Sequence, residues 1–147
     1  MKLNILLMLL FAFIAIGNTN CTAQTEKAEA QKKKDSLAGT IEGLLVDNLM
    51  TEKLELVENT EVVVTYLEIP ANTTLPKHWH PGEEFVYVLE GSVTVWQKDK
   101  PDIVLNKGDV YKIPLKQVHT AMTSDVGAKG IVFRVHEEGQ PARFKAE

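Results

Sequence analysis

Three of the four histidines in this chain belong to one pattern that includes an acidic residue. The pattern consists of His78, His80, Glu84 and, well downstream, His119. Residues two apart on a strand project from the same face, so the His78 and His80 imidazoles can point to one place. Three imidazoles and a carboxylate that converge form a ligand set for a divalent transition metal. The sequence therefore predicts a metal centre made by these four residues.

The donor types narrow the choice of metal without deciding it. Nitrogen and oxygen ligands with no thiolate favour Fe(II) or Mn(II), and they also suit Ni(II), Co(II) or Zn(II). An octahedral ion with four protein ligands keeps about two positions for other molecules. The competing interpretation is a metal-free scaffold, in which the buried imidazoles and carboxylate would have to satisfy one another's hydrogen bonds.

The elements that must position this site are predicted to be strands. From about residue 41 onward, short β-branched and aromatic runs alternate with turn residues, which is typical of a β-sandwich or small barrel. A turn at Glu90 and Gly91 is expected to join two strands into a hairpin. A helix is expected only before residue 50, where Ser36 could cap a short segment. The expected strands cover residues 61–69, 73–80, 84–89, 92–97, 102–105, 110–113, 118–123 and 130–136.

Strand alternation also predicts what surrounds the metal. Residues two and four away from Glu84 or His119 share a face with them, whereas Glu83 must point the other way, toward solvent. The apolar residues placed beside the metal in this way are Val86, Val88 and Ala121. An apolar cavity with a few polar groups suits a small organic ligand. Within such a site, Glu84 is also a candidate catalytic base.

The aromatic residues of these strands are interpreted as packing residues. Trp79 faces away from the two histidines beside it, which places it in the core or in an interface. Tyr66, Tyr87 and Tyr111 are expected to pack rather than to act as catalytic phenols.

The fourth histidine, His136, lies with Arg134 on one face of the last expected strand. If that face points inward, the pair could bind an anionic substrate or act as acid and base. The opposite face of the same strand is apolar and should seek the core, and its residues are Ile131, Phe133 and Val135. We therefore expect Arg134 and His136 to point outward, with His136 a weak candidate for catalysis and not a metal ligand.

The N-terminal residues have the pattern of a secretory signal peptide. Lys2 precedes an apolar run that ends near residue 16 and is too short to span a bilayer as a helix. Cleavage after Ala23 is expected, which defines residues 1–23 as the signal, 24–40 as a polar linker and 41–147 as one domain. The alternative is lipidation at Cys21, which would anchor the protein to a membrane.

Composition limits where the protein acts and on what. The chain of 147 residues has a net charge of −4, and loss of Lys2 with the signal makes it one unit more negative. An acidic surface argues against nucleic acid as a partner. No second hydrophobic segment is present, so we expect a periplasmic or secreted protein with no membrane contact once the signal is removed. Removal of the only cysteine, Cys21, excludes disulfides.

The histidine pattern resembles the two sequence motifs of the cupins. In the first motif His78, His80, Glu84 and Gly91 have the required spacing, and in the second Gly108, Pro114 and His119 do. The resemblance covers about residues 59–136. Three positions differ from the motifs, none of them a ligand position: Asn72 and Lys116 replace glycines, and Thr123 replaces an asparagine. Asn tolerates a left-handed backbone, so Asn72 can serve, and the turn at Lys116 is expected to be one that needs no glycine.

The resemblance implies a fold, a metal site and a range of functions. It implies a single jelly-roll barrel of about six to eight strands, with His78, His80, Glu84 and His119 binding one metal inside it. Small cupins often form homodimers, and an exposed strand edge makes that physically reasonable. The expected function is that of a metal-dependent dioxygenase, or a lyase or isomerase, acting on a small oxygenated organic molecule. The alternative is a non-enzymatic cupin that binds or senses a metal or a small molecule.

Overall fold

The computed structural model describes residues 41–147, and within that range it contains strands and no helix. The strands are β1 (Leu45–Lys53), β2 (Thr60–Ile69), β3 (His78–Trp79), β4 (Glu83–Gln97), β5 (Ile103–Asn106), β6 (Val110–Ile113), β7 (His119–Met122), β8 (Ala128–Glu137) and β9 (Phe144–Lys145). All of their pairings are antiparallel. The prediction of an all-β fold is confirmed for residues 41–147. None of the described residues forms a helix long and apolar enough to cross a membrane.

The N-terminal predictions fall mostly outside the described residues. The signal peptide at 1–23, the linker at 24–40 and a helix cap at Ser36 all lie there. The possible helix before residue 50 does not form in the part of the chain that is described, because β1 begins at Leu45 and pairs with β2. A register shift between Asn48 and Met50 interrupts that pairing. The alternation of inward and outward side chains is broken at this irregularity, which is why the sequence of β1 does not show a clear strand pattern.

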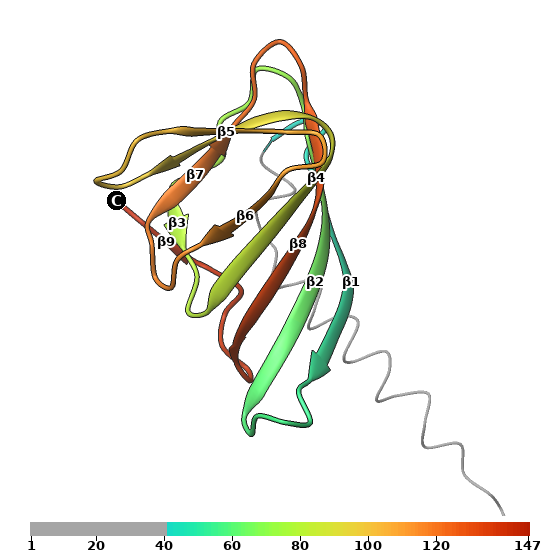
Figure 1. The fold of residues 1–147 in the computed structure, drawn as a ribbon, viewed down its shortest axis with the longest axis vertical. Helices are drawn as coiled ribbons and strands as arrows, with labels where there is room; N and C mark the ends of the chain where they lie inside the picture. The colour runs from blue at the N-terminus through green and yellow to red at the C-terminus, as the bar shows by residue number, and fades with distance from the viewer. Residues whose placement is uncertain (1–40) are drawn as a thin grey trace, which may run out of the picture.

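The sheet curls into two facing walls, with the strand order β1-β2-β8-β4-β7-β3-β9 and with β5 and β6 also paired to β4 (Figure 1). The long strand β4 belongs to both walls. Its first half pairs with β8 and β6, and its second half pairs with β5 and β7. The curled all-β sheet is consistent with a cupin jelly roll.

The predicted hairpin turn at Glu90 and Gly91 is wrong, because β4 runs through this point without a break. Its register against β8 shifts between Val88 and Glu90, so the irregularity is a bulge that bends the strand from one wall to the other. Gly91 has φ 71°. A Cβ atom there would lie 1.9 Å from the carbonyl oxygen of Gly127, so only glycine fits.

Two non-glycine residues with positive φ occupy positions where the cupin motifs have glycine. Asn72 has φ 55°, as its tolerance of left-handed backbone predicts. Lys116 has φ 56°, so the expectation that its turn needs no glycine is wrong. The turn is closed by a hydrogen bond of 3.1 Å from the Gln117 amide to the Pro114 carbonyl. A lysine in this conformation costs about 1 kcal/mol relative to glycine.

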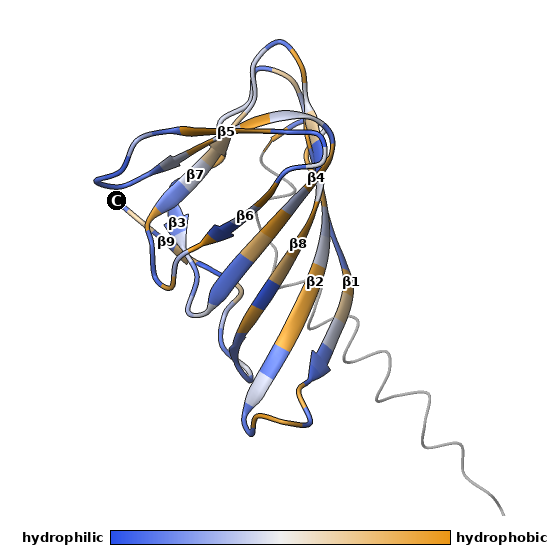
Figure 2. Ribbon diagram, in the orientation of Figure 1, coloured by the Kyte–Doolittle hydropathy of each residue, from blue (hydrophilic) through white to orange (hydrophobic). Residues whose placement is uncertain are grey.

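Aliphatic side chains from both walls fill the space between them. Figure 2 shows that the start of β4 is polar and that much of its remaining length is apolar. The core residues are Leu44, Ile69, Leu75, Val88, Val93, Val95, Leu105, Ile113 and Ala128. The polar site lies at the end of this core where β4 begins, so the apolar packing holds the strands that carry the ligands.

A C-terminal segment, which the sequence analysis did not identify as structured, closes the edge of the second wall. Its strand β9 pairs with β3, and the Ala146 amide donates a hydrogen bond of 3.0 Å to the Lys77 carbonyl. The Phe144 ring stacks on Trp79, with centroids 4.3 Å apart and planes 11° from parallel. This stack is the packing role expected for Trp79.

Candidate metal centre

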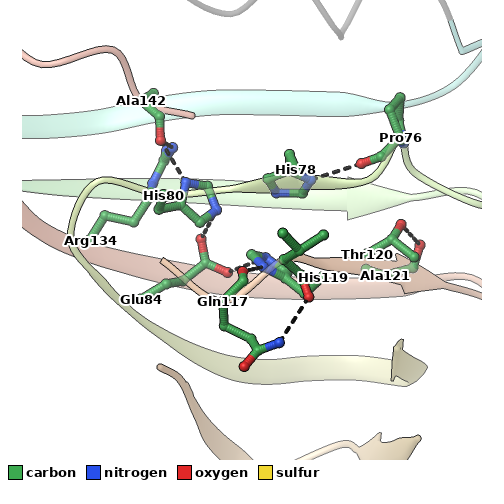
Figure 3. A network of polar contacts seen from close by, with 11 residues as sticks. Pro76, His78, His80, Glu84, Gln117, His119, Thr120, Ala121, Arg134 and Ala142 are labelled. Atoms are coloured by element: carbon green, nitrogen blue, oxygen red, sulfur yellow. Dashed lines mark hydrogen bonds and ion pairs between the residues drawn. The ribbon is translucent and has the colours of Figure 1, made fainter. Parts of the chain in front are cut away.

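The structure brings His78, His80, Glu84 and His119 together in the interior, and all four are buried (Figure 3). His78 is on β3, His80 follows it, Glu84 is on β4 and His119 is on β7. His78 and His119 face each other across the β3–β7 pairing. The spacing of the first two histidines places both rings on one side, as strand alternation predicts.

The donor atoms lie close enough to share one ion. The ring nitrogens that the three histidines offer are all within 4.8 Å of one another. The Glu84 carboxylate approaches the His80 Nε2 to 2.7 Å and the His119 Nε2 to 3.6 Å. Three ligand atoms on one ion with bonds of about 2.1 Å lie about 3 to 3.6 Å apart. Movements of about 1 Å in the side chains would therefore bring all three nitrogens onto a common metal.

Backbone carbonyls orient all three rings in the same way. The Nδ1 of His78 donates to the Pro76 carbonyl at 2.8 Å, and that of His119 donates to the Gln117 carbonyl at 2.9 Å. The Nδ1 of His80 donates to Ala142, which is 62 residues away in sequence, at 2.6 Å. Because a carbonyl only accepts, each Nδ1 carries a proton, so the neutral form of each ring presents the lone pair of Nε2. Such hydrogen bonds are the usual support of metal-binding histidines.

The electrostatics of the site favour a neutral His78 ring and an ionised Glu84 carboxylate. Burial, together with the neighbouring His119 and His80, lowers the pKa of His78 to about 3. Burial acts to raise the pKa of Glu84, but attraction and hydrogen bonding from His80 and His119 outweigh it and hold that pKa well below its usual range. Burial also acts to lower the pKa of His119, but its contacts with Glu84 raise it overall.

The residues present fit a divalent cation better than they fit one another. The buried His80 Nε2 makes no well-aligned hydrogen bond among the described residues, although a Glu84 oxygen lies 2.7 Å from it. A cation between these atoms would satisfy both the nitrogen lone pair and the carboxylate charge. The three-histidine cluster within an all-β fold of this type therefore indicates a divalent metal site, whose metal the geometry does not identify.

A cavity of roughly 100 Å³ adjoins the four residues. Most of its lining is apolar and includes the residues expected from strand alternation, Val86, Val88 and Ala121. The polar groups at its wall other than the four candidate ligands are Thr65, Lys129, Arg134 and Arg143. The expected apolar cavity beside the metal site is therefore present.

The outward orientation expected for Arg134 and His136 is wrong. Only 5% of Arg134 and 4% of His136 is exposed, whereas Phe133, next to Arg134 on the opposite face, is 42% exposed. The rule that the apolar face of a strand seeks the core fails on β8, because the interior here holds a polar site and the outer wall carries the apolar side chains. Arg134 lines the cavity, and its inward position was the alternative for this pair.

His136 is buried but is not part of the histidine cluster. Its Nδ1 bonds the Glu137 carbonyl at 2.9 Å and lies 3.8 Å from the Glu61 carboxylate. It is absent from the cavity lining. The structure therefore separates His136 from the candidate metal ligands, as expected. The residue is nevertheless buried, which was not expected.

Neighbouring residues take the supporting roles that strand alternation assigns. Glu83 points outward, with 44% of its side chain exposed, and pairs with Lys112. The hydroxyl of Tyr111 accepts a hydrogen bond of 2.9 Å from Gln97, and Tyr66 donates to Glu68 at 3.2 Å. None of the three tyrosines lines the cavity. Sequence reasoning missed Thr65 and Ala142, because their contacts join residues far apart in the chain.

A curled antiparallel sheet that holds a buried cluster of histidines with one carboxylate is the arrangement that the sequence motifs led us to expect for a cupin. The Cupin domain family matches residues 65–140, just over half of the chain. This protein therefore belongs to the cupin family, as the two sequence motifs imply. A comparison with curated proteins found no match.

Solved structures with the same fold include proteins of several kinds. The DMSP lyase DddQ from Ruegeria pomeroyi is 20% identical, with a TM-score of 0.59 over 74% of this chain and 54% of that one. A double-stranded β-helix protein from Klebsiella pneumoniae is 20% identical, with a TM-score of 0.58 over 78% and 94%. A cupin-like protein from Thermotoga maritima is 26% identical, with a TM-score of 0.52 over 66% and 77%. This chain spans about half the length of the DMSP lyase.

Proposed function

We propose that this protein is an exported, metal-dependent cupin enzyme that acts on a small oxygenated organic molecule. The observation that carries the proposal is the common orientation of the His78, His80 and His119 rings. Their Nδ1 atoms are bonded to backbone carbonyls, so their Nε2 atoms are available beside the Glu84 carboxylate. The adjoining apolar cavity supplies space for a substrate.

The three Nε2 atoms and Glu84 would hold the metal, with Fe(II) or Mn(II) favoured by the donor set and Ni(II), Co(II) or Zn(II) also suitable. When bound, the metal supplies Lewis-acid polarisation of a substrate oxygen in a lyase or isomerase, or O2 chemistry in a dioxygenase. The side chains around it exclude water and limit the size of the substrate. Glu84 stays an anion at neutral pH and can accept a substrate proton that comes within hydrogen-bond reach.

The lyase and dioxygenase versions differ in whether O2 is consumed. The lyase version has the support that two DMSP lyase structures share this fold, at 20% and 21% identity. Those identities support the fold and leave the substrate open. A non-enzymatic cupin that binds or senses a metal or a small molecule is the alternative, and it would show a change on ligand binding without turnover.

The proposal includes export and self-association. Export to the periplasm or the outside follows from the signal-peptide pattern of residues 1–23. A homodimer is proposed because β1 is the edge of the sheet and exposes Leu45, Leu49 and Met50. Light scattering on the purified protein would give twice the chain mass for a dimer, and a single chain mass would remove this part of the proposal.

Elemental analysis of untagged residues 24–147, purified without chelator, tests the metal site directly. About one Fe or Mn per chain is expected, and a His78→Ala/His80→Ala variant should contain none. Oxygen-uptake and carbonyl-lyase assays would follow on the metal-loaded protein. Absence of metal, or zinc bound equally by both proteins, would favour the binding scaffold over the enzyme.

A further inference from the structure

Arg134 is a buried cation at the cavity wall. It is 5% exposed, and among residues 41–147 no acidic side chain forms an ion pair with it. Glu84 lies opposite it in the β4–β8 register, but the Glu84 carboxylate is held by His80 and His119. A buried charge without a countercharge costs free energy, and such groups persist where they bind something.

Neutral groups fix the Arg134 guanidinium and leave part of its donor capacity unused. One terminal nitrogen donates to the Thr65 hydroxyl at 2.8 Å and the other donates to the Ala142 carbonyl at 3.2 Å. The buried Nε has no hydrogen-bond partner. A guanidinium has five N–H donors, arranged in a fork that matches a carboxylate. The side chain is therefore held rigidly with its charge and Nε–H unsatisfied.

Arg134 lies close to the candidate metal-binding residues, which limits the length of a small molecule that could contact Arg134 and the metal site together. His80 Nδ1 and Arg134 Nη1 donate to the same Ala142 oxygen, at 2.6 Å and 3.2 Å. The distance between the two nitrogens therefore cannot exceed the sum of these two lengths. Arg143 lines the same cavity and adds positive potential. A cavity of roughly 100 Å³ has room for about seven to ten water-sized groups.

We propose that Arg134 binds the carboxylate of a small organic acid, whose remaining atoms fill the apolar cavity beside the histidine cluster. The inference rests on the proposed function and names its substrate class. The mostly aliphatic lining suits one negative charge on an apolar body better than a dianion. Thr65 acts as a positioning residue, because its hydroxyl holds one terminal nitrogen of the guanidinium.

The test is an NMR titration of isotope-labelled protein with butyrate and with butanamide, its neutral counterpart of the same size. Chelator-treated and metal-loaded protein are both titrated. We expect butyrate to bind at least tenfold more tightly than butanamide, with shifts in residues of β8 and at Thr65. Inorganic phosphate should bind more weakly than butyrate, and tighter phosphate binding would overturn the carboxylate assignment.

Three variants locate the effect. Arg134→Gln should bind butyrate no more than about threefold more tightly than butanamide. Lys112→Gln, which removes an exposed cation from the outer wall, should leave the preference for butyrate unchanged. Thr65→Val should weaken butyrate binding several-fold with butanamide binding unaltered. If Arg134→Gln does not fold, as judged by circular dichroism, Thr65→Val decides, and an unchanged butyrate preference in that variant overturns the proposal.

Metal content measured on the same preparations separates this inference from the proposed function. Arg134-dependent butyrate binding by protein that takes up no metal would preserve the carboxylate site and remove the metal-dependent enzyme. Stoichiometric metal with equal affinity for butyrate and butanamide would preserve the metal site and remove the carboxylate site.

Discussion

His80 and Arg134 donate hydrogen bonds to the same atom, the carbonyl oxygen of Ala142. One backbone group thereby orients a candidate metal ligand and the cation at the cavity wall. Ala142 belongs to the C-terminal segment, which is held against β3 by β9 and by the stack of Phe144 on Trp79. The geometry of the candidate metal centre therefore depends on the docking of the last residues of the chain.

Phe144→Ala should weaken metal binding without unfolding the barrel. Loss of the stack on Trp79 loosens the segment that carries the Ala142 carbonyl, and loss of such outer support typically costs tenfold or more in metal affinity. Competition titration with a chromophoric chelator measures the change. Phe133→Ala, which removes an aromatic ring that is 42% exposed, is the control and should retain the affinity of the original chain.

His80→Ala should remove most of the bound metal and leave the barrel folded. The substitution removes one candidate ligand and the hydrogen bond of 2.6 Å to the Ala142 carbonyl, while the apolar core between the two walls is left intact. Elemental analysis and circular dichroism on the same sample give both readouts. Full stoichiometric metal in this variant would show that the site is assigned to the wrong residues.

His136→Ala should leave metal content unchanged. The His136 ring contacts Glu61 and the Glu137 carbonyl and does not line the cavity. Because the ring is buried, its removal should destabilise the protein by about 1 to 3 kcal/mol, measured by urea unfolding. Metal loss in a sample that remains folded would place this residue in the metal centre after all.

The metal-free protein should lose stability as pH falls below about 6.5. His78 has a folded-state pKa of about 3 against an ordinary value of 6.5. Between these two pH values the unfolded chain therefore binds a proton at His78 that the folded chain does not bind. The free energy of unfolding should therefore fall by up to about 1.4 kcal/mol per pH unit through this group. Urea unfolding of chelator-treated protein at pH 7.5, 6 and 5 measures the slope, and His78→Gln should reduce it. Equal slopes in the two proteins would contradict the low pKa.

Gly91→Ala should destabilise the fold far more than Gly139→Ala. The two glycines have similar positive φ values, 71° and 76°, so both substitutions carry the same backbone cost of about 1 kcal/mol. A Cβ at Gly91 would meet the Gly127 carbonyl, whereas nothing lies within 4 Å of one at Gly139. We expect a total loss of about 3 kcal/mol or more at Gly91 in urea unfolding. Similar losses at both positions would show that the bulge can adjust.

Local patterns in the sequence were sufficient for β2 and β5 to β8 and for the candidate ligands, but not for β1 or β9. Alternation placed Glu84 inward and Glu83 outward, and the structure shows the same. The spacing of His78 and His80 predicted that their rings share one side. These features depend on residues close together in the chain, where backbone geometry alone decides the direction of each side chain.

The bend in β4 and the burial of Arg134 were decided only by tertiary structure. Glu90 and Gly91 have the composition of a turn, but continued pairing with β8 makes them a bulge. Arg134 lies on the polar face of β8, and which face of a strand borders the interior depends on what the opposite wall contributes. Here the opposite wall contributes histidines, and the carbonyl of Ala142 from the distant C-terminus joins them.

The sequence by itself therefore determined an all-β cupin and four candidate metal ligands. Only the tertiary structure placed the Arg134 cation and the Ala142 carbonyl beside them, because those neighbours come from segments whose contacts no local pattern encodes.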